Sequence, residues 1–158
     1  MLTERTIIPK RILVPVDGSE NSARAADVAV EYAKKFGAEV VVLHVIAIPA
    51  HKLVEVEAGI SRLDSSELQA YFASARQKAK PIVDGVVKSA EAKDVKATGI
   101  IRDKAFSVVE TIIDQATKNK VDLIVIGTRG ITGLKKLLLG SVSSGVVDHA
   151  PCSVLVIR

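Results

Sequence analysis

Short apolar runs alternate with longer amphipathic segments along the whole chain. Five runs are predicted as strands, namely Ile12–Val16, Glu39–Ile48, Val95–Ile101, Leu123–Ile126 and Ser153–Arg158. The second run is apolar on both faces, which is typical of a buried strand. In the third run Lys96 and Thr98 alternate with Val95 and Ala97, which predicts a half-exposed edge strand.

The segments between these runs carry helical signals. After Ser19, a good N-cap, apolar residues recur at helical spacing until Gly37 ends the segment. Residues 47–64 are the least regular part. A helical stretch from Ser65 or Ser66 to about Lys93 contains Pro81, which predicts a kink or two separate helices.

Two further helices complete the pattern. Asp103 is expected to cap a helix in which Val109, Ile112, Ile113 and Ala116 line one face. Residues 141–150 form a short helix that Pro151 terminates.

The order β-α-β-α-β-α-β-α-β predicts a single α/β domain over residues 1–158, with an open parallel sheet and helices on both faces. The most apolar strands, the first, second and fourth, belong inside, so we predict the strand order 3-2-1-4-5. Ligands of open α/β sheets bind where the strand order reverses, here between the first and fourth strands. Asp17 and Gly127 both follow the carboxyl ends of these two strands.

Composition narrows the class of protein. The hydrophobic fraction is 48% with only 3% aromatic residues and no Trp, so the core is aliphatic. The net charge of +4 is spread along the chain without a basic run, which makes a nucleic-acid partner unlikely. No apolar run approaches the roughly 20 residues that span a bilayer. A lone cysteine, Cys152, and no signal-peptide pattern at the N-terminus predict a cytoplasmic protein.

The most informative motif is Gly127-Thr-Arg-Gly130, followed after nine residues by Gly140-Ser141. Glycines at the end of a strand let the backbone approach a ligand closely. A helix that begins at Ser141 presents free N–H groups, which favour an anion. The charged residues between Gly127 and Gly140 are Arg129, Lys135 and Lys136, all positive, so the loop is predicted to be a phosphate cradle.

Each of these features also has a purely structural explanation. A glycine after a strand often only marks a loop, although three glycines at this spacing favour nucleotide binding. Asp17 either stabilises the turn before Ser19 or accepts hydrogen bonds from ribose hydroxyls. His44 lies in a buried strand and is interpreted as a hydrogen-bonded core residue.

The chain resembles the ATP-binding subgroup of the universal stress proteins. The spacing of Gly127, Gly130, Gly140 and Ser141 fits that subgroup's signature. Three further segments resemble family motifs, namely Val14-Pro-Val-Asp-Gly-Ser19, Leu43-His-Val45 and Ala150-Pro-Cys-Ser-Val-Leu-Val156.

The resemblance implies a set of ligand contacts. Pro15, Val16 and Asp17 would line the adenosine part of the site, and Val45 would contact adenine. The phosphates would be held by Gly127, Thr128, Arg129, Gly130, Ile131, Thr132 and Gly133, together with Gly140, Ser141, Val142 and Ser143. The implied cofactor is ATP, with Mg²⁺ or Mn²⁺ bound to its phosphates, and the implied assembly is a homodimer through the last strand.

One departure from the family concerns the turn after the third strand. Many relatives carry Gly-x-Pro there, whereas this chain is expected to have Ile101-Arg-Asp-Lys-Ala105 at that place. Three functions therefore remain open. The first is a nucleotide-dependent regulatory protein of the stress response, the second a slow ATP-hydrolysing enzyme, and the third a nucleotide-free dimeric interaction protein. The enzyme hypothesis lacks an evident general base. Asp17 is the one obvious candidate near the loop, and the resemblance gives it the role of holding the ribose.

Overall fold

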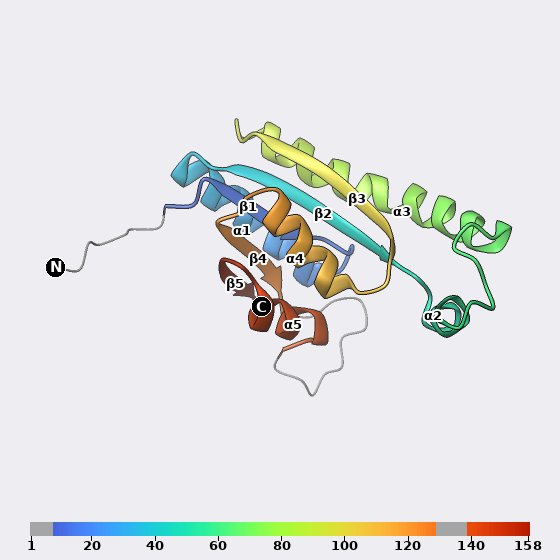
Figure 1. Cartoon of the computed structure of the whole chain (residues 1–158). Coiled ribbons are helices and arrows are strands. Elements are labelled where there is room, and N and C mark those ends of the chain that lie inside the picture. The colour runs from blue at the N-terminus through green and yellow to red at the C-terminus, as the bar shows by residue number, and fades with distance from the viewer. Residues whose placement is uncertain (1–7, 129–138) are drawn as a thin grey trace.

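The computed structural model describes residues 8–128 and 139–158, and it is an open five-stranded sheet flanked by helices (Figure 1). The elements in chain order are β1 (Arg11–Pro15), α1 (Glu20–Phe36), β2 (Glu39–Ala47), α2 (Ala50–Glu57), α3 (Ser66–Glu91), β3 (Ala97–Ala105), α4 (Val108–Lys118), β4 (Leu123–Gly127), α5 (Ser141–His149) and β5 (Ser153–Ile157). The strand order is β3-β2-β1-β4-β5 and every neighbouring pair is parallel, so the predicted topology is confirmed.

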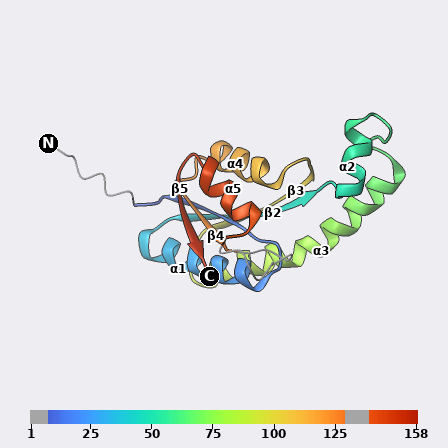
Figure 2. The same ribbon diagram turned by 90° about the horizontal axis from the view of Figure 1, so that it is seen from below.

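The helices cover both faces of the sheet, as predicted. Helices α1 and α3 lie on one face, and α4 and α5 lie on the other (Figure 2). The alternation of strand residues builds the two cores, because Val40 and Val42 face α1 and α3 whereas Val41 and Leu43 face α4 and α5. Across residues 8–128 and 139–158, none of the helices has the length and apolarity needed to cross a membrane.

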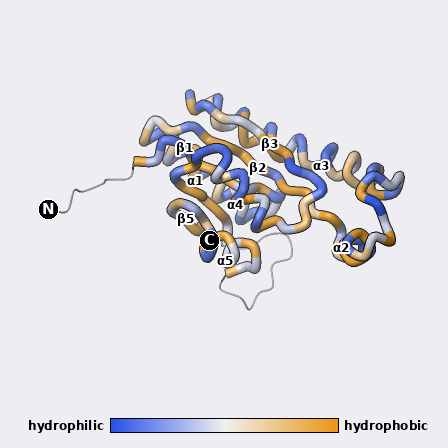
Figure 3. The backbone as a smooth tube through the Cα atoms, viewed as in Figure 1, coloured by the Kyte–Doolittle hydropathy of each residue, from blue (hydrophilic) through white to orange (hydrophobic). Residues whose placement is uncertain are grey.

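The central strands are apolar and buried (Figure 3). In β1 the residues Ile12, Leu13 and Val14 are fully buried, whereas most of β3 is exposed or half-buried. This matches the prediction that the first strand is internal and the third lies at an edge.

Serine caps define three of the helix starts. The side chain of Ser19 accepts a hydrogen bond from the N–H of Ser22, and Ser65 does the same for Leu68. The Ser19 cap was predicted, and Ser65 is one of the two serines at which the later helix was expected to begin. Helix α1 ends at Gly37, whose φ of 68° is the left-handed conformation that glycine adopts without strain.

The middle of the chain differs from the expectation in two places. The irregular segment contains a helix, α2, which has no buried residue and therefore no strong hydrophobic period. Of the two outcomes expected at Pro81, two separate helices are ruled out, since α3 runs through it as one helix, and the kink stays a prediction. Proline removes one helical N–H, and the carbonyl of Gln77 that loses its partner lies in an exposed part of the helix, where water can satisfy it.

The region after β3 also differs from the prediction. The strand continues to Ala105, so Asp103 lies within it and does not cap α4. Its carboxylate instead accepts a hydrogen bond of 2.7 Å from Nε of Arg76 on α3. The cap of α4 is Ser107, whose side chain accepts from the N–H of Glu110.

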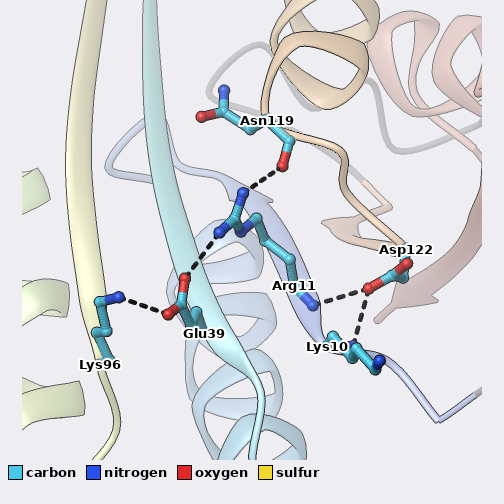
Figure 4. A network of polar contacts seen from close by, with 6 residues as sticks. All are labelled: Lys10, Arg11, Glu39, Lys96, Asn119 and Asp122. Atoms are coloured by element: carbon cyan, nitrogen blue, oxygen red, sulfur yellow. Dashed lines mark hydrogen bonds and ion pairs between the residues drawn. The ribbon is translucent and has the colours of Figure 1, made fainter.

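A network of polar contacts joins the strands at the amino-terminal edge of the sheet (Figure 4). One carboxylate oxygen of Asp122 accepts from the backbone N–H groups of Lys10 and Arg11, at 2.8 and 2.9 Å. The Arg11 guanidinium pairs with Glu39, and Glu39 also accepts from Lys96. Strands β1 and β4 are therefore aligned at the end opposite to the tips that follow Pro15 and Gly127.

We expect Asp122→Ala to lower the free energy of unfolding by about 2 kcal/mol, because two N–H groups lose a charged acceptor. Denaturant unfolding measures the change, with Asp27→Ala as the control. Asp27 is an exposed aspartate on α1, and its replacement should cost less than about 0.5 kcal/mol. Equal effects of the two substitutions would contradict the assigned role of Asp122.

Candidate functional site

The tips of β1 and β4 lie side by side at the carboxyl edge of the sheet. The two strands pair in register through Ile12 with Leu123 and Leu13 with Ile124. Asp17 follows β1 and Thr128 follows β4, so the two predicted parts of the site meet where the strand order reverses. The predicted residues Arg129, Gly130, Ile131, Thr132 and Gly133 lie outside the described residues.

The β1 tip is a hydrogen-bonded turn. The N–H of Val16 donates to the carbonyl of Leu43 at 2.8 Å. Oδ1 of Asp17 accepts from the N–H of Ser19 at 2.9 Å, and the N–H of Asp17 donates to Oγ of Ser22 at 3.3 Å. Asp17 therefore stabilises the turn, which was one of its two interpretations, and the contact with ribose stays a prediction. The buried Ser22 was not predicted, since a serine in the first turn of a helix is common.

Thr128 joins the end of β4 to the start of α5. It is 6% exposed, and its N–H donates to the carbonyl of Ile157 at 2.8 Å. Its own carbonyl accepts from the N–H of Gly140 at 2.6 Å and from Oγ of Ser143 at 2.9 Å. Thr128 and Gly140 thus lie together although eleven residues separate them in sequence.

The N-terminus of α5 has no side-chain cap among the described residues. Its N-cap is Gly140, which makes no side-chain hydrogen bond, whereas α1, α3 and α4 are each capped by a serine hydroxyl. The first N–H groups of a helix need an acceptor, and the helix dipole favours a negative one. This helix start, at the tip of β4, is therefore suited to an anion.

Gly127 has a packing reason to be glycine. A Cβ at this position would lie 2.8 Å from the backbone carbon and oxygen of Asn21 in α1. The missing side chain thus lets the end of β4 approach α1 closely. This contact was not predicted, and it accounts for one glycine of the motif without a ligand.

The other predicted residues differ in what they offer to a ligand. Pro15 ends β1, and Val16 is 4% exposed with its side chain in the core, so only its backbone faces the tip. The half-buried side chain of Val45 packs with the α4 and α5 core. At the start of α5, Ser141 is exposed and Val142 packs on the same core. The Ser143 hydroxyl is buried against the carbonyls of Thr128 and Gly140, which leaves its backbone N–H for a ligand.

His44 lies beside the β1 tip, on the face of β2 opposite to Val45. Its side chain is half-buried, and its buried Nδ1 has no hydrogen-bond partner among the described residues. Burial lowers the pKa of His44, and this effect exceeds the opposing effects of the Val16 backbone and of the Asp17 carboxylate. His44 is therefore a half-buried residue whose Nδ1 lacks a described partner, and the predicted hydrogen-bonded core residue is not confirmed.

The turn between β3 and α4 consists of Phe106 and Ser107. The segment Ile101–Ala105, which was expected to form this turn, belongs to the strand instead. Glycine and proline are nevertheless absent from Phe106, Ser107 and Val108, so the departure from Gly-x-Pro persists at the corrected place. Phe106 is 51% exposed.

The described residues also form a groove that lies apart from the predicted contacts. A groove of about 410 Å³ runs between β3 and α4, and none of the predicted site residues lines it. Within the part of the chain that the structure describes, no group of three or more His, Cys, Asp or Glu residues is close enough to hold a metal ion.

Comparison with known proteins identifies the family. The profile of the Universal stress protein family matches residues 9–158. The chain belongs to this family. The universal stress protein MJ0531 of Methanocaldococcus jannaschii is 38% identical over 151 residues, which cover 94% of this chain and 82% of that protein. The universal stress protein YxiE of Bacillus subtilis is 32% identical, and the match covers 94% of this chain and 98% of YxiE.

Solved structures share the fold, and universal stress proteins are among them. The protein MJ0577 superposes with a TM-score of 0.79 at 28% identity, over 96% of both chains. The universal stress protein from Archaeoglobus fulgidus in complex with dAMP gives a TM-score of 0.64 at 23% identity, over 96% of this chain and all of that one. A universal stress protein in complex with cAMP gives 0.64 at 21% identity, over 95% and 97% of the chains.

In this universal stress protein we expect Ser143→Ala to lower the free energy of unfolding by about 1–2 kcal/mol, because the buried link to the carbonyl of Thr128 is lost. Ser144→Ala is the matched control, since Ser144 is half-buried on the same helix and its hydroxyl has no described hydrogen bond. Denaturant unfolding of both variants measures the difference. A Ser143 variant as stable as the Ser144 variant would show that the link contributes nothing.

The lowered pKa of His44 predicts a pH dependence of stability. The unfolded chain takes up the imidazole proton near pH 6.5, whereas the folded protein takes it up at a lower pH. The contribution of His44 is therefore complete above pH 6.5 and is lost as the pH falls below that value. Unfolding free energies at several pH values should show a smaller fall for His44→Gln than for the wild type. His51→Gln, at an exposed histidine of α2, should keep the wild-type slope.

Proposed function

We propose that this chain is an ATP-binding member of the universal stress proteins, with a nucleotide-dependent regulatory role in the stress response. The observation that carries the proposal is the helix start of α5. Within residues 8–128 and 139–158 its N–H groups have no side-chain cap, and they lie at the tip of β4 beside the tip of β1. A phosphate group supplies the acceptor that this helix start lacks.

The proposed contacts divide between the two tips. The triphosphate binds the start of α5 at Gly140 and Ser141, together with the loop that begins at Gly127. The nucleoside lies toward Asp17 and Val45. Mg²⁺ or Mn²⁺ binds with the phosphates, because such ions in nucleotide sites are held largely by phosphate oxygens and water.

The comparisons support an adenine nucleotide as the ligand class. Two structural neighbours are complexes with cAMP and dAMP, which are adenine nucleotides held by proteins of the same fold. ATP rather than a monophosphate follows from the positive residues Arg129, Lys135 and Lys136 between the glycines of this chain. A longer chain of phosphates needs this additional positive charge.

We propose a homodimer formed through β5. This strand pairs with β4 on one side, and four of its five residues, Val154 to Ile157, are half-buried and apolar. A second copy that pairs along the open edge would cover them. Sedimentation at several protein concentrations distinguishes a dimer from a monomer.

Titration calorimetry with MgATP tests the nucleotide proposal, and we expect a Kd in the micromolar range, about −8 kcal/mol. Gly140→Val should abolish binding, because a branched side chain would stand at the start of α5 where the phosphates bind. Gly85→Val is the matched control, since a Cβ at Gly85 meets nothing within 4 Å. Absence of heat with wild-type protein at millimolar MgATP would refute the proposal.

Two simple assays distinguish the alternative functions. Release of nucleotide that absorbs at 260 nm from a freshly purified, denatured sample would contradict an interaction protein with an empty cradle. Turnover of ATP faster than about once per second, near the low end of ordinary enzymes, would favour the enzyme. We expect bound nucleotide and slower turnover.

A further inference from the structure

The groove between β3 and α4 lies outside the proposed nucleotide site. β3 is an edge strand (Figure 1), and its last residues, 102–105, form one wall of the groove. The other wall is the side of α4 on which Glu110, Asp114 and Lys118 recur at intervals of four residues. The volume of about 410 Å³ is within the range of small-molecule sites.

The β3 wall is positively charged because its one acidic residue is paired elsewhere. Arg102 lies two residues after Ile100, which packs with the α4 and α5 core, so Arg102 is on the α4 face of the strand. Within residues 8–128 and 139–158 the side chains of Arg102 and Lys104 make no hydrogen bond or ion pair. Asp103 stands between them in sequence, but its carboxylate pairs with Arg76 of α3 on the opposite face of the sheet.

The α4 wall carries an unpaired acid. Asp114 pairs with Lys118 at 2.8 Å, so these two charges cancel, whereas the carboxylate of Glu110 has no partner in the described part of the chain. The pKa of Asp114 is lowered, mainly by its hydrogen bond with Lys118, and Arg102 across the groove adds a smaller effect in the same direction. The charges of the two walls therefore act on each other, although none of the described ion pairs spans the groove.

Lys104 has a backbone conformation that lysine rarely adopts. Its φ of 57° is left-handed, and it lies where the pairing of β3 with β2 shifts register, between Val45 and Ala47. The other non-glycine residues with positive φ in the described ranges, Asp94 and Lys120, follow the ends of helices, where this conformation is usual. Strained residues occur preferentially at binding sites, so Lys104 adds an independent reason to examine this groove.

We propose that the groove binds a zwitterion of dipeptide size: its carboxylate meets Arg102 and Lys104 on β3, and its ammonium group meets Glu110 on α4. Each wall then gains the opposite charge that the described side chains do not supply. An anion would bring like charge toward Glu110, and a cation would bring like charge toward the β3 wall. The charges of a dipeptide lie at its two ends, as those of the groove lie on two walls. The ring of Phe106, which also lines the groove and is 51% exposed, can pack against an apolar side chain.

Titration with alanyl-phenylalanine tests the proposal, because this dipeptide carries both charges and an aromatic side chain. N-acetyl-alanyl-phenylalanine lacks the ammonium group, and alanyl-phenylalanine amide lacks the carboxylate. We expect the unmodified dipeptide at millimolar concentration to cause saturable shifts of the backbone amide NMR signals of β3 and α4. Each blocked form should bind about tenfold more weakly, the size of one lost charged hydrogen bond.

Charge-removing variants assign the two walls. Glu110→Gln should weaken the unmodified dipeptide about tenfold and leave the affinity for the N-acetyl form unchanged, which also shows that the variant is folded. The double variant Arg102→Gln and Lys104→Gln should weaken the unmodified dipeptide likewise and leave the affinity for the amide form unchanged. The controls Lys78→Gln and Glu91→Gln, at exposed residues away from the groove without described ion pairs, should keep wild-type affinity.

Three results would overturn the zwitterion site. Equal affinities for the unmodified and blocked peptides would show that neither charge is recognised. Weakening of the blocked and unmodified forms alike in the Glu110 variant would separate its effect from the ammonium group. No shift in β3 and α4 at millimolar dipeptide would show that the groove takes no such ligand. These titrations contain no nucleotide, so each of the three results leaves the proposed nucleotide function standing.

Discussion

The arrangement of the candidate site depends on the carbonyl of Thr128. This one oxygen accepts hydrogen bonds from the N–H of Gly140 and from the buried hydroxyl of Ser143. Because Thr128 continues β4, the two bonds fix the first turn of α5 against the tip of a central strand. Without these bonds α5 could still pack its apolar face on the sheet. None of the other described hydrogen bonds would then fix the position of its first N–H groups relative to the tip of β4. The proposed anion site therefore depends more on these two bonds to a backbone carbonyl than on any side chain that a ligand would touch.

The sheet was predictable because each of its strands carries a local signal. Buried strands such as β1 are continuous apolar runs, and the serine caps at Ser19 and Ser65 mark where helices begin. The signal weakens where burial ends. The last part of β3 is Arg102, Asp103 and Lys104, polar residues that an edge strand accepts because water covers one side. Helix α2 was missed for a related reason, since none of its residues is buried.

The candidate site was predictable in its location but not in the roles of its residues. The glycine motif and Asp17 were expected at adjoining tips, and the strand order brings those tips together. Gly127 was interpreted as leaving room for a ligand, yet its nearest constraint is the backbone of Asn21. No spacing rule connects residues 21 and 127, because their contact exists only once α1 packs across β4. The bond between Thr128 and Ser143 could not be predicted either, since no local sequence pattern connects two residues so far apart in the chain.

Thr128 also links the candidate site to the edge strand of the sheet, β5. The N–H of Thr128 donates to the carbonyl of Ile157, the last residue of β5, while its carbonyl holds α5. One peptide segment thus bonds both the helix start that suits a phosphate and the strand that presents an open apolar edge. A displacement of α5 would change the hydrogen bonds of Thr128, and a change at Thr128 would act directly on β5. In a dimer formed through β5, this short path would connect the ligand of one subunit to the contact with the other, without any movement of the central strands.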